Sequence, residues 1–381
     1  MTAYNDIASH QTMLFDAVRN NVYSNAISTC VTNDSVVLDL GAGMGLHGLM
    51  AAKAGAKKVY LVDPSPAVLV AKTIAKENGL DSVEVIQSAI QDVELPEQVD
   101  IIISVFTGNF LLSEDLLQWL FIARDKFLKP GGVMLPDKAR MFVAPVSMPD
   151  YYGSQVETWS DEHPDSLFQR HKLSYESAKK YSSNRIFYDR FSTELFQFLA
   201  KPAMVNEIDF CGATSADCDS TQEYEVISEG ICHGWLGWFE MALRENWLST
   251  SPESSNTHWS QALLPLNNPV KLLKNENIKL TLKRPQNGDW SWTTSAHSDQ
   301  QQSTFLAKTI TSELIKKQLP TYTPDRSAQA KQLHYALSLF DGKNTVTEIA
   351  ARLQNEYPKS FNLPGSAQRF AQMLAVKYSD S

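Results

Sequence analysis

The 381-residue sequence has no run of 18 or more apolar residues, the length that a membrane-spanning helix needs. Its first residues, MTAYNDIASHQ, lack the basic start and the apolar core of a secretory signal. The cysteines show no Cys-x-x-Cys spacing, so neither a zinc site nor a disulfide framework is indicated. They are Cys30, Cys211, Cys218 and Cys232. We therefore expect a cytoplasmic protein with no membrane segment and no metal site.

Positive charge is also scarce. The sequence holds 34 lysine and arginine residues against 43 aspartate and glutamate residues, a net charge of −9 at pH 7. Nucleic-acid binding requires a basic surface, so no nucleic-acid partner is expected. The acidity is compatible with a cationic substrate, although an ordinary acidic cytosolic protein has the same balance. Length and an apolar content of 43% are sufficient for two or three domains with cores of their own.

What the sequence does contain is a glycine-rich turn after an apolar run. Val36–Leu40 is predicted as a buried strand that carries Asp39, and a helix is expected from Leu46 onward. Three glycines at alternate positions lie between them: Gly41, Gly43 and Gly45. Glycine lets the backbone approach a ligand closely. A dinucleotide fingerprint would need glycine at position 46. The spacing is typical instead of enzymes that bind S-adenosylmethionine (SAM).

Strands and helices alternate over the first 145 residues. A second strand is predicted over residues 58–63 and ends on Asp63. At that point a carboxylate can accept hydrogen bonds from ribose hydroxyls, although an aspartate there can also be a helix N-cap. A helix is expected at 67–78 and further strands at 83–87 and 99–104, while residues 127–136 are expected to hold a helix end, a tight turn and a fifth strand. The alternation predicts an α/β fold, a Rossmann-like parallel sheet that binds its ligand at the carboxyl ends of the strands.

The pattern changes from about residue 146. Short alternating strands are expected at 204–210, 224–228, 230–243 and 278–284, which predicts an antiparallel β-barrel domain over residues 146–303. Helical periodicity returns at 304–318, 326–340, 346–357 and 366–378. The expected organisation is thus a SAM-binding domain over residues 1–145, the β-barrel domain, and a small helical or winged-helix domain over residues 304–381.

In combination, several motifs resemble the protein arginine methyltransferases across about residues 4–300. The matching segments are the SAM loop and its helix (37–58), a hairpin (100–114), the strand that leaves the SAM domain (127–136), a barrel strand (233–239) and a loop containing Thr257-His258-Trp259 (251–261). The resemblance implies a SAM-dependent N-methyltransferase, a peptide or protein substrate, and a homodimer formed through an arm within residues 150–200.

The resemblance also implies a set of cofactor-binding residues. Arg19 would hold the SAM carboxylate with its planar guanidinium, and Asp63 would hold the ribose. The other candidates are His10 and Met13 on the first helix, Ile90 and Gln91 beside the adenine, and Asp39, Gly41, Gly43 and Gly45 in the glycine turn. Gln91 departs from the family, which often has glutamate there. Tyr4 matches a tyrosine of the N-terminal aromatic motif.

Three residues are candidates for the chemistry: Glu114, His258 and Asp16. Asp16 and His258 align with a pair that joins the N-terminal helix to the barrel in the family. A carboxylate fixes the tautomer of an imidazole and favours its charged form. The pair is expected to take part in catalysis or mainly to shape the pocket.

The sequence departs from the family at one catalytic position. The family holds the substrate guanidinium with two glutamates of one hairpin; Glu114 matches the second, and Val105 replaces the first. A guanidinium stays protonated, and a lost charge-assisted hydrogen bond is worth about 1.5–3 kcal/mol. Three outcomes stay open: arginine held by another carboxylate, a less basic acceptor that needs only Glu114, or SAM binding with little catalysis in a regulatory or scaffold subunit. The second is preferred narrowly over the first. Small-molecule methylation in natural-product biosynthesis is a further alternative.

Residues 304–381 lie outside the resemblance. The segment 339–353 resembles the helix-turn-helix of small winged-helix domains of the PqqD peptide-binding type. Two roles stay open for this region, namely peptide recognition and plain packing or dimer support.

Overall fold

The computed structural model describes residues 7–379, so Tyr4 lies outside the described residues. The chain divides into two compact units, Met1–Thr309 and Ile310–Ser381. Within residues 7–379, no helix is long and apolar enough to cross a membrane.

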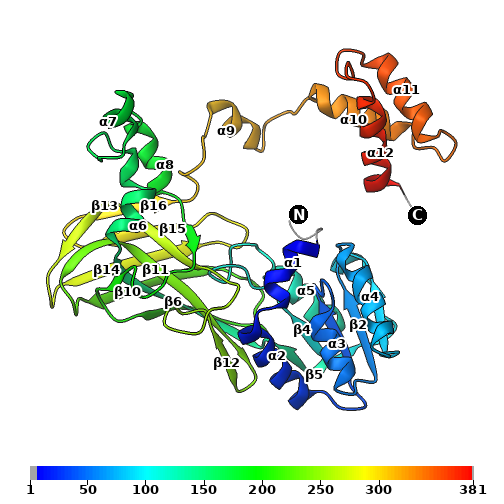
Figure 1. The fold of residues 1–381 in the computed structure, drawn as a ribbon, viewed down its shortest axis with the longest axis horizontal. Helices are drawn as coiled ribbons and strands as arrows, with labels where there is room; N and C mark the ends of the chain where they lie inside the picture. The colour runs from blue at the N-terminus through cyan, green and yellow to red at the C-terminus, as the bar shows by residue number, and fades with distance from the viewer. Residues whose placement is uncertain (1–6, 380–381) are drawn as a thin grey trace. The chain divides into compact units, whose positions relative to one another are not determined.

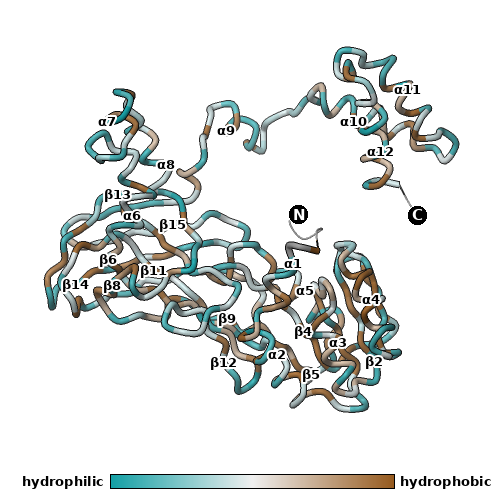
Figure 2. The backbone as a smooth tube through the Cα atoms, in the orientation of Figure 1, coloured by the Kyte–Doolittle hydropathy of each residue, from teal (hydrophilic) through white to brown (hydrophobic). Residues whose placement is uncertain are grey.

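The first part of the larger unit is a five-stranded parallel sheet of order β3-β2-β1-β4-β5. The strands are β1 (Val36–Leu40), β2 (Lys58–Val62), β3 (Val83–Ile86), β4 (Val99–Ser104) and β5 (Leu128–Leu135). Every residue of β1 is buried, because helices pack along the sheet (Figure 1). These helices are α2 (Ala17–Cys30), α3 (Leu46–Lys53), α4 (Ala67–Glu77) and α5 (Leu117–Phe127). The predicted Rossmann-like sheet is confirmed, and it carries long hydrophobic stretches (Figure 2).

The N-terminal segment forms two helices. Helix α1 (Ile7–Leu14) ends before Asp16, and α2 follows it. Asp16 has an extended backbone conformation and its side chain accepts a hydrogen bond from the Arg19 amide, as an N-cap residue does. The break therefore places Asp16 and Arg19 together at the start of α2.

The rest of this unit is the predicted antiparallel β-domain, which consists of two sheets. The seven-stranded sheet contains β6 (Lys138–Ser147), β7 (Phe187–Asp189), β8 (Gln197–Phe198), β9 (Ala203–Asp209), β11 (Gly230–Leu243), β12 (Asn246–Ser249) and β13 (Gln261–Leu272). The four-stranded sheet has the order β10-β14-β15-β16, formed by β10 (Cys218–Glu225), β14 (Asn277–Arg284), β15 (Ser291–Ser295) and β16 (Asp299–Ser303). Three short helices project together from one end of the β-domain (Figure 1): α6 (Pro149–Gln155), α7 (Leu167–His171) and α8 (Lys179–Ser183).

The smaller unit is helical and has a core of its own. It contains α9 (Ser312–Gln318), α10 (Ala328–Ser338), α11 (Val346–Glu356) and α12 (Ser366–Tyr378). Thr345 and Glu348 form a capping box at the start of α11. A winged helix needs a β-hairpin, and residues 310–379 contain no strand. Pro358 and Pro364 in the connection between α11 and α12 lack the N–H that strand pairing requires. Of the two predicted alternatives, the structure therefore supports a small helical domain rather than a winged helix.

Candidate functional site

The glycine turn after β1 requires its glycines for two reasons. Gly41, Gly43 and Gly45 have φ of 68°, 53° and 81°, in the left-handed region that favours glycine. A Cβ atom on Gly43 would lie 3.0 Å from the His10 ring, and one on Gly41 would lie 2.0 Å from the Phe106 ring. The turn is thus in close contact with both α1 and the hairpin that follows β4.

Two aspartates hold the turn in place. Asp39 is buried, and its Oδ2 accepts a hydrogen bond of 2.7 Å from the Gly48 amide. Burial raises the pKa of Asp39 to about 7. Asp63 accepts bonds from the Gly43 amide at 2.8 Å and from the Ser65 amide at 2.7 Å. The N-cap of α4 is Pro66, so Asp63 does not cap that helix. A carboxylate has about four acceptor positions, which leaves Asp63 able to take a further donor.

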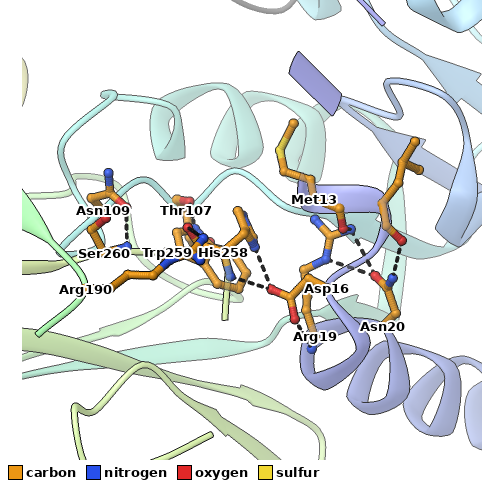
Figure 3. A network of polar contacts seen from close by, with 11 residues as sticks. Met13, Asp16, Arg19, Asn20, Thr107, Asn109, Arg190, His258, Trp259 and Ser260 are labelled. Carbon is orange, nitrogen blue, oxygen red and sulfur yellow. Dashed lines mark hydrogen bonds and ion pairs between the residues drawn. The ribbon is translucent and has the colours of Figure 1, made fainter. Parts of the chain in front are cut away.

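Arg19 lies buried at the start of α2. Its Nε and Nη2 donate to Asn20 Oδ1 at 3.0 and 2.9 Å, and Nη2 also donates to the Met13 carbonyl. Asn20 in turn donates to the Leu14 carbonyl at 2.7 Å (Figure 3). The guanidinium therefore joins the two N-terminal helices across their break. The sequence did not indicate Asn20, because an asparagine inside a helical stretch is ordinarily a surface residue.

Asp16 joins α2 to the β-domain. Its Oδ2 lies 2.8 Å from both the backbone N and Nδ1 of His258, while its Oδ1 accepts from the Arg19 amide at 2.9 Å (Figure 3). Burial opposes ionisation of Asp16, but the hydrogen bonds from His258 and Arg19 outweigh it and hold the Asp16 pKa below its ordinary value. An ionised carboxylate only accepts, so Nδ1 of His258 carries the proton and Nε2 carries a lone pair.

Asp16 favours the charged form of His258, but burial of the imidazole outweighs this effect. Burial lowers the pKa of His258 below its ordinary value, although the hydrogen bond that Nδ1 donates to Asp16 acts in the opposite direction. The imidazole is accordingly neutral at pH 7, with its proton directed at the carboxylate.

The loop of His258 also holds the hairpin that follows β4. Trp259 donates from Nε1 to the Thr107 carbonyl at 2.7 Å, and the Ser260 amide donates to Asn109 Oδ1 at 2.8 Å (Figure 3). Arg190 from the β-domain donates to the His258 carbonyl at 3.1 Å. Two elements about 150 residues apart in sequence are thus joined at two points. Thr107 and Asn109 enter this network although the resemblance assigned them no role.

The hairpin backbone is strained close to Glu114. Phe110, Leu111 and Asp115 have φ of 46°, 62° and 55°, which residues other than glycine adopt rarely. Such strain persists only where the surroundings impose it, and it clusters at functional sites. Glu114 itself is exposed, whereas Val105 is half-buried and packs against the core.

Two contacts impose this conformation. The ring of Phe110 stacks on Trp290 with centroids 5.2 Å apart. Asp115 forms an ion pair with the buried Arg284 at 2.6 Å. Both ends of the segment that carries Glu114 are therefore fixed to the β-domain.

The structure brings most of the predicted residues into this region. His10, Met13, Arg19, Asp63 and the glycines meet around the turn, and Asp16 and His258 lie in the same network of contacts. Ile90 is buried in the short 3-10 helix Ile90–Asp92, and Gln91 is exposed. Within the described part of the chain, no polar contact connects Gln91 to the network, and no group of three or more His, Cys, Asp or Glu side chains is arranged to hold a metal ion.

Comparison with known proteins identifies the family. Residues 37–132 match the model of a methyltransferase domain, and residues 137–297 match the arginine methyltransferase oligomerization subdomain. The probable protein arginine N-methyltransferase 6.2 of Oryza sativa subsp. indica is 34% identical over 316 residues, covering 73% of this chain and 78% of that protein. The chain belongs to the protein arginine methyltransferase family. Like the other members, it is a methyltransferase whose cofactor is SAM.

Other members of the family extend the likeness. Protein arginine N-methyltransferase 1 of Oryza sativa subsp. indica is 32% identical over 286 residues, covering 72% of this chain and 71% of that protein. Among solved structures, the Trypanosoma brucei PRMT1 enzyme-prozyme heterotetrameric complex with AdoHcy matches with a TM-score of 0.70 at 29% identity. Arabidopsis thaliana protein arginine methyltransferase 10 matches with a TM-score of 0.67 at 28% identity. Each match covers 79% of this chain and 99% of the other.

Proposed function

We propose that this arginine methyltransferase family member methylates a side-chain nitrogen of a protein or peptide, with arginine as the first acceptor and a less basic nitrogen as the second. The relatives it matches are protein arginine N-methyltransferases. The proposal rests on the position of Glu114. This residue lies on a strained hairpin that the Asp115–Arg284 ion pair and the Trp259 loop fix to the β-domain.

The residues around the glycine turn fit SAM. The glycines of the turn have no side chains to keep a ligand from the main chain, and Asp63 keeps acceptor positions for ribose hydroxyls. Arg19 would hold the cofactor carboxylate. The remaining contacts would come from His10, Met13, Asp39, Gly45, Ile90 and Gln91. When bound, SAM supplies a methyl group on a positively charged sulfur, so its leaving group needs no further activation.

The chain's own residues would then position the acceptor. Glu114 accepts an N–H of the acceptor nitrogen, orients it and balances its charge. Holding two reactants in the productive geometry lowers the reaction barrier by up to about 7–11 kcal/mol. Nε2 of the neutral His258 is an available base, and Asp16 keeps that imidazole in the required tautomer. Asp16 acts through His258 and is therefore a positioning residue.

Val105 favours the second candidate. An apolar side chain where the family has a carboxylate offers no partner for a guanidinium, whereas an imidazole or amine needs fewer acceptors. It equally favours a SAM-binding regulatory subunit with little turnover. The experiment therefore has to identify the acceptor atom.

The test uses the full chain, SAM and three peptides that differ only in one residue: arginine, lysine or histidine. Mass analysis of the products is expected to show the gain of one or more methyl masses on the arginine peptide. Gain on the lysine or histidine peptide alone would replace arginine by a less basic nitrogen. SAM binding without methylation of any peptide would leave the regulatory subunit as the better interpretation.

We also propose that the chain is a homodimer of the cytoplasm. The match to an oligomerization subdomain and the projecting helices α6 to α8 support the dimer. The four free cysteines are consistent with a reducing compartment. Sedimentation of the chain alone would show a monomer if the proposed dimer is wrong, and cell fractionation tests the compartment.

A further inference from the structure

A polar cleft of about 220 Å³ lies in the β-domain between β13, β16 and the end of α8. Side-chain amides make up almost all of its lining: Asn184, Asn267, Asn268, Gln300, Gln301 and Gln302. Asp299 at the start of β16 contributes the one carboxylate of the lining. Each amide offers both a donor and an acceptor, so the cleft matches a ligand that itself alternates N–H and C=O groups.

One of these amides lacks the partner that its burial demands. Gln302 is 1% exposed, and among the described residues its Oε1 has no hydrogen-bond partner. Buried polar groups are ordinarily paired. The Oε1 of Gln302 is therefore an acceptor ready for an N–H group that enters the cleft.

A neighbouring amide of the cleft already pairs with main-chain groups of the chain itself. Gln300 Oε1 accepts from the Asn268 amide at 2.9 Å, and Gln300 Nε2 donates to the Asn268 carbonyl at 2.8 Å. One side-chain amide thus pairs with both main-chain groups of one residue. Gln302 lies two residues farther along β16 and so points to the same face of the strand.

Strand β16 is also an open edge of the four-stranded sheet, since its one neighbour in that sheet is β15. The Ser303 amide donates to Asn184 Oδ1 at 2.8 Å and so points away from β15. Main-chain groups two residues apart point to the same side of a strand, and those of Gln301 therefore face the same open edge. An extended peptide can pair with such an edge through its main chain.

We propose that this amide-lined cleft binds an extended main-chain segment of the protein acceptor, with Gln302 Oε1 and the Gln301 edge as its anchors. The inference rests on the proposed protein substrate. Strand β13 connects the hairpin to the cleft. Its first residue, Gln261, follows Ser260, which contacts the hairpin, and Asn267 of the same strand lines the cleft. Six residues of strand span no more than about 20 Å. An extended acceptor peptide with about six residues beyond the methylated one is therefore long enough to fill both places.

The test uses the full chain with two fluorescent acceptor peptides of one sequence, a short one of about five residues and a long one of about twenty. Gln302→Leu removes the buried acceptor and leaves an apolar side chain. Gln301→Pro removes an N–H that faces the open edge, where proline is tolerated. Gln222→Leu in β10, at the opposite edge of the same sheet, is the matched control.

Binding of the long peptide, measured by anisotropy, is expected to weaken about three- to tenfold in Gln302→Leu and in Gln301→Pro, the effect of one lost hydrogen bond. Binding of the short peptide and of SAM should not change, nor should either peptide respond to Gln222→Leu. Equal affinity of all variants for the long peptide overturns the inference. A Gln302-dependent affinity with no methylation of either peptide would leave the cleft in place and overturn the proposed function instead.

Discussion

Asp16 and His258 lie 242 residues apart in the sequence, yet the Asp16 Oδ2 atom accepts both the backbone N–H and the Nδ1–H of His258 at 2.8 Å. The other oxygen of the same carboxylate caps α2. One side chain therefore determines where the cofactor-side helix begins, how the β-domain loop is placed, and which nitrogen of the imidazole carries the proton.

Asp16→Asn should lower methyl transfer more than tenfold and reduce the free energy of unfolding by about 1–3 kcal/mol. Asparagine caps helices as well as aspartate does, so the start of α2 is kept. Its NH₂ group, however, must face either the Arg19 amide or the two donors of His258, and one donor is left unsatisfied. Urea denaturation and turnover measure the two effects. Asp34→Asn, at an exposed position, is the control, and matching values for the two variants would contradict the assigned role.

The parallel sheet was predictable because its strands are buried on both faces. Val36–Leu40 and Val99–Ser104 are almost continuous apolar runs, and three glycines at alternate positions leave little choice for the turn. The exposed face of β14 is equally regular, since its residues alternate between exposed and buried. Period and glycine spacing alone are enough for these elements.

Elements that depend on distant partners were not predictable. Strand β13 contains Asn267-Asn268-Pro269, which looks like a turn, and β16 reads Asp-Gln-Gln-Gln-Ser with no apolar residue. Both form strands because neighbouring strands and side-chain amides complete their hydrogen bonds. The break at Asp16 depends in the same way on His258. The resemblance suggested the Asp16–His258 pair, but not Asn20 or the contacts of Thr107 and Asn109.

Val105→Glu should increase arginine methylation about 10- to 100-fold, the equivalent of a charge-assisted hydrogen bond of about 1.5–3 kcal/mol. The new carboxylate would supply the second partner that a guanidinium requires. Val105→Gln has the same size without the charge and serves as the control. Mass analysis with the arginine peptide gives the measurement. A variant no faster than Val105→Gln would show that a carboxylate at this position does not limit the reaction.

His233 should make the protein less stable as the pH falls below about 6.5. Its Nδ1 accepts from the Met148 amide at 3.1 Å, and burial lowers its pKa. Below the unfolded-state pKa the unfolded chain therefore binds more protons, and the free energy of unfolding declines until the lowered folded pKa is reached. His47 and His258, whose pKa values burial also lowers, act in the same direction.

Asp39 acts in the opposite direction, because its raised pKa makes the folded protein bind more protons between about pH 4 and 7. Because Asp39 titrates in both proteins, the contribution of His233 is the difference in pH-dependent stability between His233→Gln and the unmodified chain. Glutamine still accepts from the Met148 amide but does not titrate. Chemical denaturation between pH 7 and 5 should give a smaller decline for the variant, and parallel curves would rule out the contribution of His233.

The raised pKa of Asp39, about 7, should make cofactor affinity depend on pH. SAM carries positive charge, so the ionised carboxylate binds it better, and one pH unit below the pKa about nine-tenths of Asp39 is protonated. We expect the affinity of the unmodified chain for SAM to fall about tenfold between pH 8 and pH 6 by calorimetry. Asp39→Asn keeps the acceptor for the Gly48 amide and should abolish this difference. An equal pH dependence in both proteins would assign it to another group.

Trp259→Phe should slow methyl transfer because it releases the hairpin that carries Glu114, and not because the protein unfolds. The variant keeps the buried ring but leaves the Thr107 carbonyl without its donor, at a cost of about 1–3 kcal/mol. Trp292→Phe is the matched control. Trp292, on β15 of the four-stranded sheet, is also buried, and its Nε1 donates to the Pro265 carbonyl at 2.9 Å. Both variants should lose similar stability in urea. At a temperature where both are folded, only Trp259→Phe should lower kcat, because only Trp259 contacts the segment that carries Glu114. Equal kcat values for the two variants would mean that this hydrogen bond stabilises the fold without positioning the catalytic hairpin.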